Sequence, residues 1–373
     1  GVAYLSGLIR DVPTAVHVEH YAEIVLGHAA RRAVIDAAAG VVRDAHAGPV
    51  DVEAAAASLR RAVEPFAAEP PAGDGFFAAA MDAHRARVQA RWDGTLVERV
   101  VPTGVGAIDR LLMGGFRSGD LAFVGGRPGS GKTAWVLQLA QAAARRTGEA
   151  ALVVELEMSA EAVRDRAIAA EAGVAFSVAY DRLGDRAKRE AWLEASARLE
   201  AVPVAIETRL RTTDAVAAHA ERLAAERGLG LVCIDHLDYL ADRTRGETAE
   251  QRTAELTRRC KALAQRLGCP VVVLAQLNRE VELTKPYTPT LRHFRNSGAI
   301  EQDTDYAFLL YRRRYYVDKG MLDPDPAADF VGDSGKHRVE LLVAKNRNGE
   351  VRGVELAWRP ETMSFHEVTW GTA

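Results

Sequence analysis

The sequence predicts an α/β fold with a mainly parallel sheet for residues 93–373, preceded by helices. Two observations support this prediction. Short apolar and β-branched runs alternate with helical patterns from about Val100 onward, which is typical of parallel strands covered by helices on both faces. The last apolar runs lie closer together and indicate antiparallel strands at the end of the sheet. The expected strands are 121–125, 151–156, 204–206, 231–234, 271–275, 306–311 and 338–344, and the expected helices are 133–146, 159–172, 213–227 and 248–267.

Length and composition are those of an ordinary globular protein. The 373 residues are 48% hydrophobic and 27% charged, which excludes wholesale disorder and suggests two or three domains. No stretch approaches the ~20 apolar residues that span a bilayer and no secretion signal opens the chain, so we expect a cytoplasmic protein with no membrane partner. The net charge of −3 neither demands nor excludes nucleic acid. Cys233, Cys260 and Cys269 lack the spacing of metal ligands and are expected to be buried thiols.

Residues 1–64 are expected to form a helical N-terminal domain. Apolar residues recur at spacings of three and four over residues 17–47, where Gly27 is expected to bend or break the helix. A second helix is expected to begin after Asp51, a suitable N-cap, and to end before Pro65.

Residues 65–92 are expected to form a linker and a linker helix. Residues 65–75 contain three prolines and two glycines without periodicity. The helical pattern that follows puts one stripe of side chains on a single face, which either packs on its own domain or docks on a neighbouring subunit. The stripe consists of Phe77, Met81, His84, Val88 and Trp92.

A glycine-rich segment between the first strand and the first helix of the α/β domain fits the complete P-loop pattern. Its glycines let backbone N–H groups curl around phosphates, and the following helix N-terminus adds positive potential. Lys132 is expected to reach the β- and γ-phosphates of ATP or another NTP, and the Thr133 hydroxyl to bind Mg²⁺. The segment consists of Gly126, Arg127, Pro128, Gly129, Ser130, Gly131, Lys132 and Thr133.

Two further strands end in polar side chains that suit the same site. Strand 231–234 runs into Asp235, the form of a Walker B acid that holds Mg²⁺ and its water beside Thr133. Strand 271–275 runs into Gln276, whose amide either senses the γ-phosphate or only makes a hydrogen bond at the strand end.

A nucleotide hydrolase also needs a group that aligns the attacking water, and two acids compete for this role. Glu155 and Glu157 both lie at the carboxyl end of strand 151–156, on the edge where ligands bind in such sheets. Their alternative role is to stabilise the N-terminus of helix 159–172. The residue pattern does not separate the two acids.

The loop at 279–298 is basic, which either suits it to bind the phosphates of a nucleic acid or makes it an ordinary solvated surface. Its basic residues are Arg279, Lys285, Arg292 and Arg295.

Together these motifs resemble the bacterial replicative DNA helicase family, DnaB, over essentially the whole chain. The lead-in at 102–121 is shared by RecA-like ATPases in general. Three segments are more specific: Glu-Leu-Glu-Met-Ser at 155–159, Arg-Asn-Ser-Gly-Ala-Ile-Glu-Gln-Asp at 295–303, and Ala-Lys-Asn-Arg-Asn-Gly at 344–349. The early segment 13–25 is similar to that family's N-terminal helical domain, entered partway through.

The resemblance implies a RecA-like P-loop ATPase core in a motor of defined architecture. Members of the family form a ring, usually a hexamer, that encircles single-stranded DNA and moves along it 5′ to 3′ by NTP hydrolysis. Such a ring unwinds the duplex at the replication fork, and the expected partners in the primosome are a primase and a helicase loader.

The resemblance also implies roles for individual residues. Glu157 corresponds to the catalytic glutamate of the family's Leu-Glu-Met motif, whereas the position of Glu155 is usually Ser. Gln276 corresponds to the γ-phosphate sensor. Arg347 corresponds to the arginine finger and Lys345 to its companion, both donated to the neighbouring subunit's nucleotide. The DNA-binding loop is expected to contain Arg295, Asn296 and Gly298.

A few positions depart from the usual pattern of the family, and none of them removes a catalytic group. The segment 313–337 is rich in Asp and Pro and has no functional interpretation. The departures are His236, Asp238, Asn296 and Glu350.

Two alternative functions remain. One is a RecA- or RadA-like recombination ATPase or a KaiC-like protein, although a RadA-like chain should carry a Cys-rich zinc module before the core, and this sequence has none. The other is a nucleotide-gated assembly factor that does not unwind DNA. Intact Glu157 and Arg347 argue against a hydrolysis-dead binder but do not establish unwinding.

Overall fold

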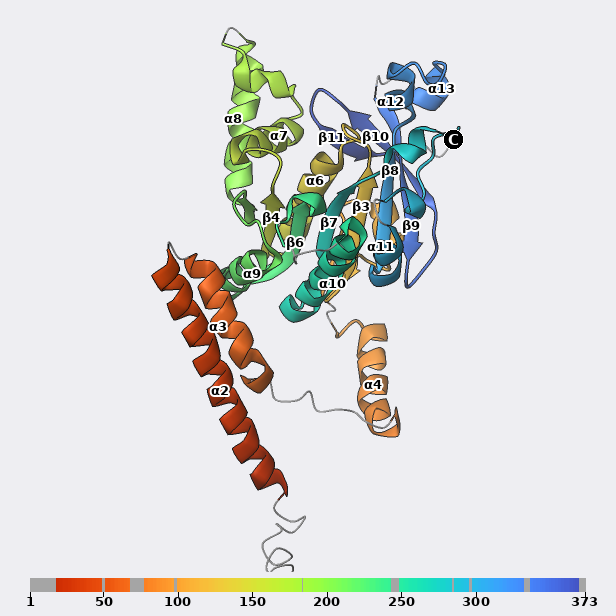
Figure 1. The fold of residues 1–373 in the computed structure, drawn as a ribbon. Coiled ribbons are helices and arrows are strands. Elements are labelled where there is room, and N and C mark those ends of the chain that lie inside the picture. Colours follow the sequence, from red (N-terminus) through yellow and green to blue (C-terminus); the bar gives the residue numbers. More distant parts are fainter. Residues whose placement is uncertain are drawn as a thin grey trace, which may run out of the picture. The chain divides into compact units, whose positions relative to one another are not determined.

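The computed structural model divides the chain into two compact units, Gly1–Glu98 and Arg99–Ala373 (Figure 1). The residues that it describes are 18–48, 51–67, 77–96, 99–182, 184–242, 248–283, 285–294, 297–331 and 336–368.

The first unit is helical in its described residues, with α2 (Val18–Ala47), α3 (Val52–Ala67) and α4 (Phe77–Trp92). Helices α2 and α3 pack against each other side by side (Figure 1). Asp51 caps α3, because its Oδ1 accepts hydrogen bonds from the backbone N–H groups of Glu53 (3.0 Å) and Ala54 (3.1 Å). The expected N-cap is therefore confirmed.

The structure contradicts a helix break at Gly27 and a helix end before Pro65. Helix α2 continues through Gly27, since one glycine inside a long helix costs only about 1 kcal/mol. Helix α3 continues past Pro65 to Ala67 and ends there. Proline has no backbone N–H, so the last part of the helix has one hydrogen bond fewer. The linker helix is present as α4, with 76% of Trp92 exposed, and its docking on a neighbouring subunit stays a prediction.

The second unit is built on a nine-stranded sheet with the order β11-β10-β9-β8-β3-β7-β6-β4-β5 among its described residues. In this spatial order, neighbouring strands from β8 through β3, β7, β6 and β4 to β5 run parallel. Strands β9, β10 and β11 pair antiparallel and extend the sheet beyond β8, as the sequence predicts. A short antiparallel ribbon, β1 (Val100–Val101) with β2 (Phe116–Arg117), precedes the sheet. The strand bounds are β3 (Leu121–Gly126), β4 (Ala150–Glu155), β5 (Val204–Glu207), β6 (Leu229–Asp235), β7 (Val271–Gln276), β8 (Tyr306–Tyr311), β9 (His337–Asn346), β10 (Gly353–Arg359) and β11 (Ser364–Glu367).

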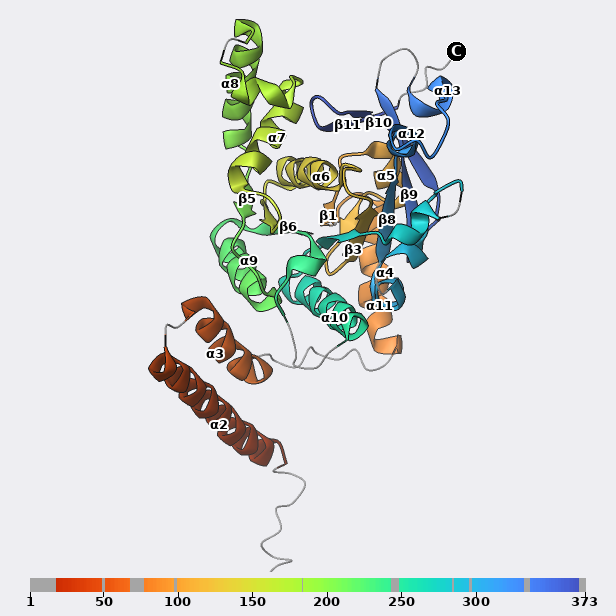
Figure 2. The same ribbon diagram turned by 45° about the horizontal axis from the view of Figure 1, so that its top comes forward.

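Helices connect the parallel strands and cover both faces of the sheet (Figure 2). Helix α8 was not predicted from the sequence, because it is charge-rich and buries only Ala195 fully. Strands β10 and β11 were not predicted either. The helices are α5 (Gly106–Leu111), α6 (Lys132–Thr147), α7 (Ala160–Ala172), α8 (Arg186–Glu200), α9 (Thr213–Arg227), α10 (Ala249–Leu267), α11 (Ser297–Asp303), α12 (Arg313–Asp318) and α13 (Pro326–Asp329), with 3₁₀ turns at η2 (Phe176–Tyr180), η3 (Leu237–Tyr239), η4 (Arg279–Glu282) and η5 (Leu291–His293).

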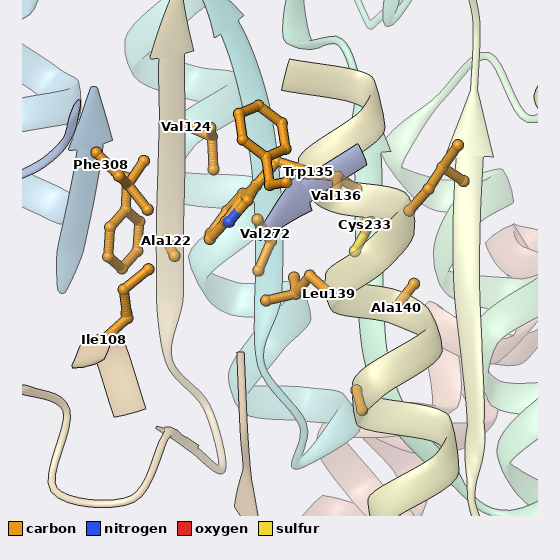
Figure 3. Close-up of a cluster of buried hydrophobic side chains, with 14 of the residues drawn as sticks. Ile108, Ala122, Val124, Trp135, Val136, Leu139, Ala140, Cys233, Val272 and Phe308 are labelled. Atoms are coloured by element: carbon orange, nitrogen blue, oxygen red, sulfur yellow. The ribbon is translucent and has the colours of Figure 1, made fainter. Parts of the chain in front are cut away.

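Two hydrophobic cores lie on the two faces of the sheet. On one face, Trp135 of α6 is buried with its ring centroid 5.6 Å from that of Phe308, and Figure 3 shows it beside Val124. On the other face, Phe123 packs in a core that includes Leu263 of α10. Because successive residues of β3 bury on opposite faces, the strand is a continuous apolar run.

The parallel strands place their carboxyl ends on one edge of the sheet, where ligands bind in folds of this kind. Glu155, Asp235 and Gln276 end β4, β6 and β7, and the P-loop leaves the same end of β3. The fold therefore gathers the sequence-predicted groups at one edge.

Cys233, Cys260 and Cys269 are free and buried as expected, and burial raises the pKa of each thiol. In the described part of the chain, no helix has the length and apolar character required to cross a membrane.

Candidate nucleotide-binding and catalytic site

The P-loop joins β3 to the N-terminus of α6. Gly131 is the N-cap of α6 with φ of 99°, and Gly129 has φ of 73°, a left-handed backbone that glycine adopts without strain. A Cβ atom on Gly131 would lie 2.7 Å from the Phe365 ring, so only glycine fits there. The first N–H groups of α6 lack partners within the helix and provide a site for anionic phosphate.

The Lys132 side chain lies across this loop. Its Nζ donates hydrogen bonds to the carbonyl oxygens of Gly126 (2.8 Å) and Arg127 (3.3 Å). Burial lowers the pKa of Lys132 to about 8, although Asp235 and Glu157 act in the opposite direction. A partly desolvated ammonium beside the P-loop is well placed to attract phosphate oxygens.

Thr133 and Asp235 meet directly, as the sequence predicts. The Thr133 hydroxyl donates a 2.5 Å hydrogen bond to Asp235 Oδ2, and burial raises the pKa of Asp235. Hydroxyl and carboxylate oxygens suit Mg²⁺, which keeps waters and shares phosphate oxygens rather than occupying an all-protein cage. The residues present therefore fit a nucleotide-bound Mg²⁺ ion.

The structure gives Glu155 and Glu157 different surroundings. Glu155 is fully buried, and its Oε1 accepts hydrogen bonds from the backbone N–H groups of Glu157 and Met158, both at 2.9 Å. Burial raises the pKa of Glu155 to about 7, and the nearby Asp235 carboxylate adds to this shift. Glu157 has 58% of its side chain exposed, and its Oε2 lies 3.9 Å from His236 Nε2. Glu155 thus supports the turn, whereas Glu157 is accessible to a ligand.

A cavity of about 410 Å³ opens at this edge of the sheet. Three residues of the P-loop are not part of its lining: Gly126, Arg127 and Ser130. The Arg127 side chain instead donates hydrogen bonds to Leu277 and Glu282. The sequence-predicted residues that line the cavity are Pro128, Gly129, Gly131, Lys132, Thr133, Glu157, Asp235 and Gln276.

Gln276 is placed directly beside the P-loop. It ends β7 in register with Gly126 of β3, and its side chain lines the cavity next to the start of the P-loop. This placement is compatible with contact between the Gln276 amide and a bound phosphate.

The cavity also contains residues that the sequence analysis missed. Arg166 of α7 and Arg312, directly after β8, each have a buried Nε atom without a hydrogen-bond partner among the described residues. Burial lowers the pKa of Arg312. Arg312 comes directly after β8, at the same carboxyl edge where Asp235 and Gln276 end β6 and β7, and that position was the signal available in the sequence. The remaining lining includes Met158, His236, Trp358, Pro360 and Met363.

Arg347 and Lys345 lie at the opposite edge of the sheet from the P-loop. Arg347 Nη1 is 3.0 Å from Oδ1 of Asp305, which precedes β8. The backbone N–H of Asp305 in turn donates to the carbonyl oxygen of Leu121, at the start of β3. The P-loop begins at the other end of that six-residue strand, a span of roughly 17 Å. Lys345 Nζ donates to the carbonyl oxygens of Glu301 and Gln302 at the end of α11.

The predicted DNA-binding residues are only partly visible. Arg295 and Asn296 lie outside the described residues. Gly298 is exposed in the first turn of α11, a helix that leads into the amino end of β8. Phe294 is buried immediately before this segment.

Comparison with known proteins identifies the family. A model of the DnaB-like helicase C-terminal domain matches residues 100–367. The chain belongs to the DnaB-like replicative DNA helicase family. It is 32% identical over 379 residues to the replicative DNA helicase DnaB of Geobacillus stearothermophilus, covering 98% of this chain and 78% of that protein. It is 30% identical over 380 residues to the replicative DNA helicase DnaC of Bacillus subtilis, with the same coverage.

Solved structures agree with the fold. The ATPase domain of G40P matches with a TM-score of 0.68 at 23% identity, covering 78% of this chain and 99% of that chain. A DnaB-like replicative helicase, solved in a study of its interactions with primase, matches with a TM-score of 0.76 at 21% identity, covering 99% of this chain and 83% of that chain.

Membership in the family confirms the function that the sequence motifs predict. The chain is an ATP-dependent DNA helicase of DNA replication with a RecA-like core. The recombination ATPase and the non-unwinding assembly factor are not supported.

Proposed function

We propose that this chain works as a ring-shaped homo-oligomer, with six subunits expected, in which each nucleotide site is completed by the neighbouring subunit. The observation that carries this proposal is the position of Arg347, at the edge of the sheet opposite its own P-loop. An arginine that far from its own cavity serves a nucleotide only if another subunit presents one. Lys345 lies at the carboxyl end of β9, shortly before Arg347, and is proposed as the companion of Arg347 at the neighbouring nucleotide.

Within one subunit, the cavity residues would have separate roles in binding and hydrolysing ATP. Lys132 and the N–H groups of the P-loop would bind the phosphates, and Thr133 with Asp235 would hold Mg²⁺. Glu157, the more exposed acid, would accept the proton of the attacking water and align it, while Gln276 would contact the γ-phosphate. When bound, ATP with Mg²⁺ supplies the phosphoanhydride bond whose hydrolysis drives movement.

The proposed track is single-stranded DNA, along which the ring moves 5′ to 3′. We propose that the phosphate backbone is bound by Arg295, Asn296 and Gly298. A motor that moves along any sequence needs contacts without sequence preference, and contacts to phosphate have none. A primase is proposed as a partner because the similar DnaB-like helicase was solved in a study of its interactions with one. A helicase loader is proposed as a further partner. The cytoplasmic replication fork is proposed as the place where the ring acts, because both follow from the function of a replicative helicase.

Two measurements test the proposal. The mass of the full chain in solution should correspond to a closed ring, six subunits being expected, in the presence of ATP and Mg²⁺. A forked duplex with a 5′ single-stranded tail should be unwound only with hydrolysable nucleotide. A monomer under all nucleotide conditions, or unwinding that requires a 3′ tail, would refute the ring or the polarity respectively.

A further inference from the structure

The second residue of the P-loop directs its side chain away from the nucleotide cavity. The guanidinium of Arg127 is buried and makes two hydrogen bonds, from Nη1 to the Leu277 carbonyl oxygen and from Nε to Glu282 Oε1, both at 2.8 Å. Leu277 follows the proposed sensor Gln276, and Glu282 is the last residue of η4. One charged side chain therefore joins the P-loop to the segment that follows β7.

Helix α12 and the turn after it hold Glu282 from the other side. The Tyr315 hydroxyl and Lys319 Nζ each donate to Glu282 Oε1 at 3.2 Å, and Lys319 Nζ lies 4.4 Å from the centre of the Tyr315 ring. Burial by itself raises the pKa of Glu282, but hydrogen bonds from Arg127 and Lys319 outweigh it and lower the pKa. Glu282 is thus an ionised carboxylate fixed between the P-loop and α12, which gives part of segment 313–337 a structural role.

The segment after β7 also contacts the residues that precede the proposed DNA-binding loop. The Asn278 N–H donates to the His293 carbonyl oxygen at 2.8 Å, and Leu277 forms an antiparallel bridge with Phe294. The next residue in the chain is Arg295. These two backbone contacts join the segment after β7 to the residues that immediately precede Arg295.

We propose that Arg127 and Glu282 are positioning residues that couple nucleotide binding at the P-loop to single-stranded DNA binding at the loop containing Arg295. The bidentate reach of Arg127, to a carbonyl and to a carboxylate, ties the position of the P-loop to that of the β7–η4 segment. The proposal rests on the proposed function, from which it takes both ligands. A purely structural role for the pair would change stability but not the coupling between the two ligands.

The experiment measures the coupling as a ratio of affinities in the full-length protein. A fluorescein-labelled thymidine oligonucleotide is titrated without nucleotide and with adenylyl imidodiphosphate plus Mg²⁺, and the ratio of the two dissociation constants is the coupling factor. We expect the parent protein to bind DNA at least about fivefold more tightly with the nucleotide. We expect Glu282→Gln, which removes the charge but keeps the size, to reduce this ratio below about twofold.

Matched variants separate coupling from stability. Glu280→Gln changes an exposed acid on the same 3₁₀ turn and should keep the parent ratio. Arg127→Lys retains the charge but cannot reach both partners, so it should lose the coupling in part. Combining Arg127→Met with Glu282→Gln should lower the ratio no further than Glu282→Gln alone, because the two side chains act as one unit. Thermal unfolding of each variant reports any separate change in stability.

The outcomes are distinct. A parent-like ratio in Glu282→Gln overturns the proposal, and so does a parent ratio close to one. Independent, multiplicative effects of the two substitutions also overturn it, since they would mean that the side chains act separately. A parent protein that binds no oligonucleotide in either state refutes the proposed DNA binding itself, and the inference with it.

Discussion

Arg347 is anchored to Asp305 at both its backbone and its side chain. Its N–H donates to the Asp305 carbonyl oxygen at 3.0 Å, and its Nη1 lies 3.0 Å from Asp305 Oδ1. Even so, 68% of the Arg347 side chain is exposed. The pair fixes the turn after β9 at the amino edge of the sheet and leaves most of the Arg347 side chain exposed, as the proposed action on another subunit requires.

Arg347→Ala should lower ATP turnover severely, by about 10³-fold or more, with only a mild change in nucleotide affinity, since an arginine finger stabilises charge that develops in the transition state. Lys132→Ala should also abolish hydrolysis, because the phosphates lose a mobile cation. Mixing the two inactive proteins should restore part of the ATPase activity, because some interfaces then combine an intact P-loop with an intact finger. No recovery despite demonstrated subunit exchange would place Arg347 outside catalysis in trans.

Glu157→Gln should bind nucleotide normally and hydrolyse it poorly, since only the charge that aligns the water is lost. Glu155→Gln should retain more turnover, because an amide oxygen still accepts the N–H groups of Glu157 and Met158. Single-turnover hydrolysis and nucleotide titration measure the two effects. The assignment is wrong if Glu157→Gln keeps full turnover while Glu155→Gln loses it.

Arg295→Ala should weaken binding of single-stranded DNA uniformly across sequences and leave basal ATPase activity largely intact. Because the expected contacts are to phosphate, the affinity of the parent should fall with salt, and the variant should reduce the slope of log K against log[salt] by about one. Fluorescence anisotropy at several salt concentrations measures this. Arg189→Ala, an exposed arginine of α8, serves as the control. A preference for one DNA sequence, unchanged in the variant, would contradict the assignment of the loop.

Asp305→Asn should lower the free energy of unfolding by about 3 kcal/mol, because the Lys261 ammonium, 2.6 Å from Asp305 Oδ2, loses its partner in a mostly buried position. Burial raises the pKa of Asp305, but Lys261, the Leu121 N–H and Arg347 outweigh it and lower the pKa. The stabilisation by this carboxylate is therefore complete above its unfolded pKa of about 4 and is lost as the pH falls through its lower folded value.

Urea unfolding at pH 7 and at pH 3 tests this prediction. The difference between Asp305→Asn and the parent should be large at pH 7 and smaller at pH 3. Glu350→Gln, an exposed acid near the same turn, should behave like the parent at both values. An equal difference at the two pH values would show that the carboxylate charge does not provide the stabilisation.

The sequence was sufficient for the order of the elements around the nucleotide site. The P-loop pattern, the apolar run into Asp235 and the run into Gln276 are local signals, because buried parallel strands are continuous apolar segments and their polar ends stand out. The same local signals failed for α8, where charged residues cover a nearly unburied helix, and for Gly27, which the surrounding helix tolerates. Weak or absent periodicity leaves such elements to be set by their surroundings.

By itself the sequence determined the proposed chemistry of this protein: which residues are expected to bind phosphate and magnesium, and which family's motifs they follow. Only the tertiary structure decided the geometry. It separated Glu155 from Glu157 by burial, directed Arg127 away from the cavity to Glu282, and placed Arg347 at the edge opposite its own P-loop. The physical reason is that motif identity is carried by adjacent residues, whereas burial, ion pairing and the edge of a sheet depend on contacts between residues far apart in the chain.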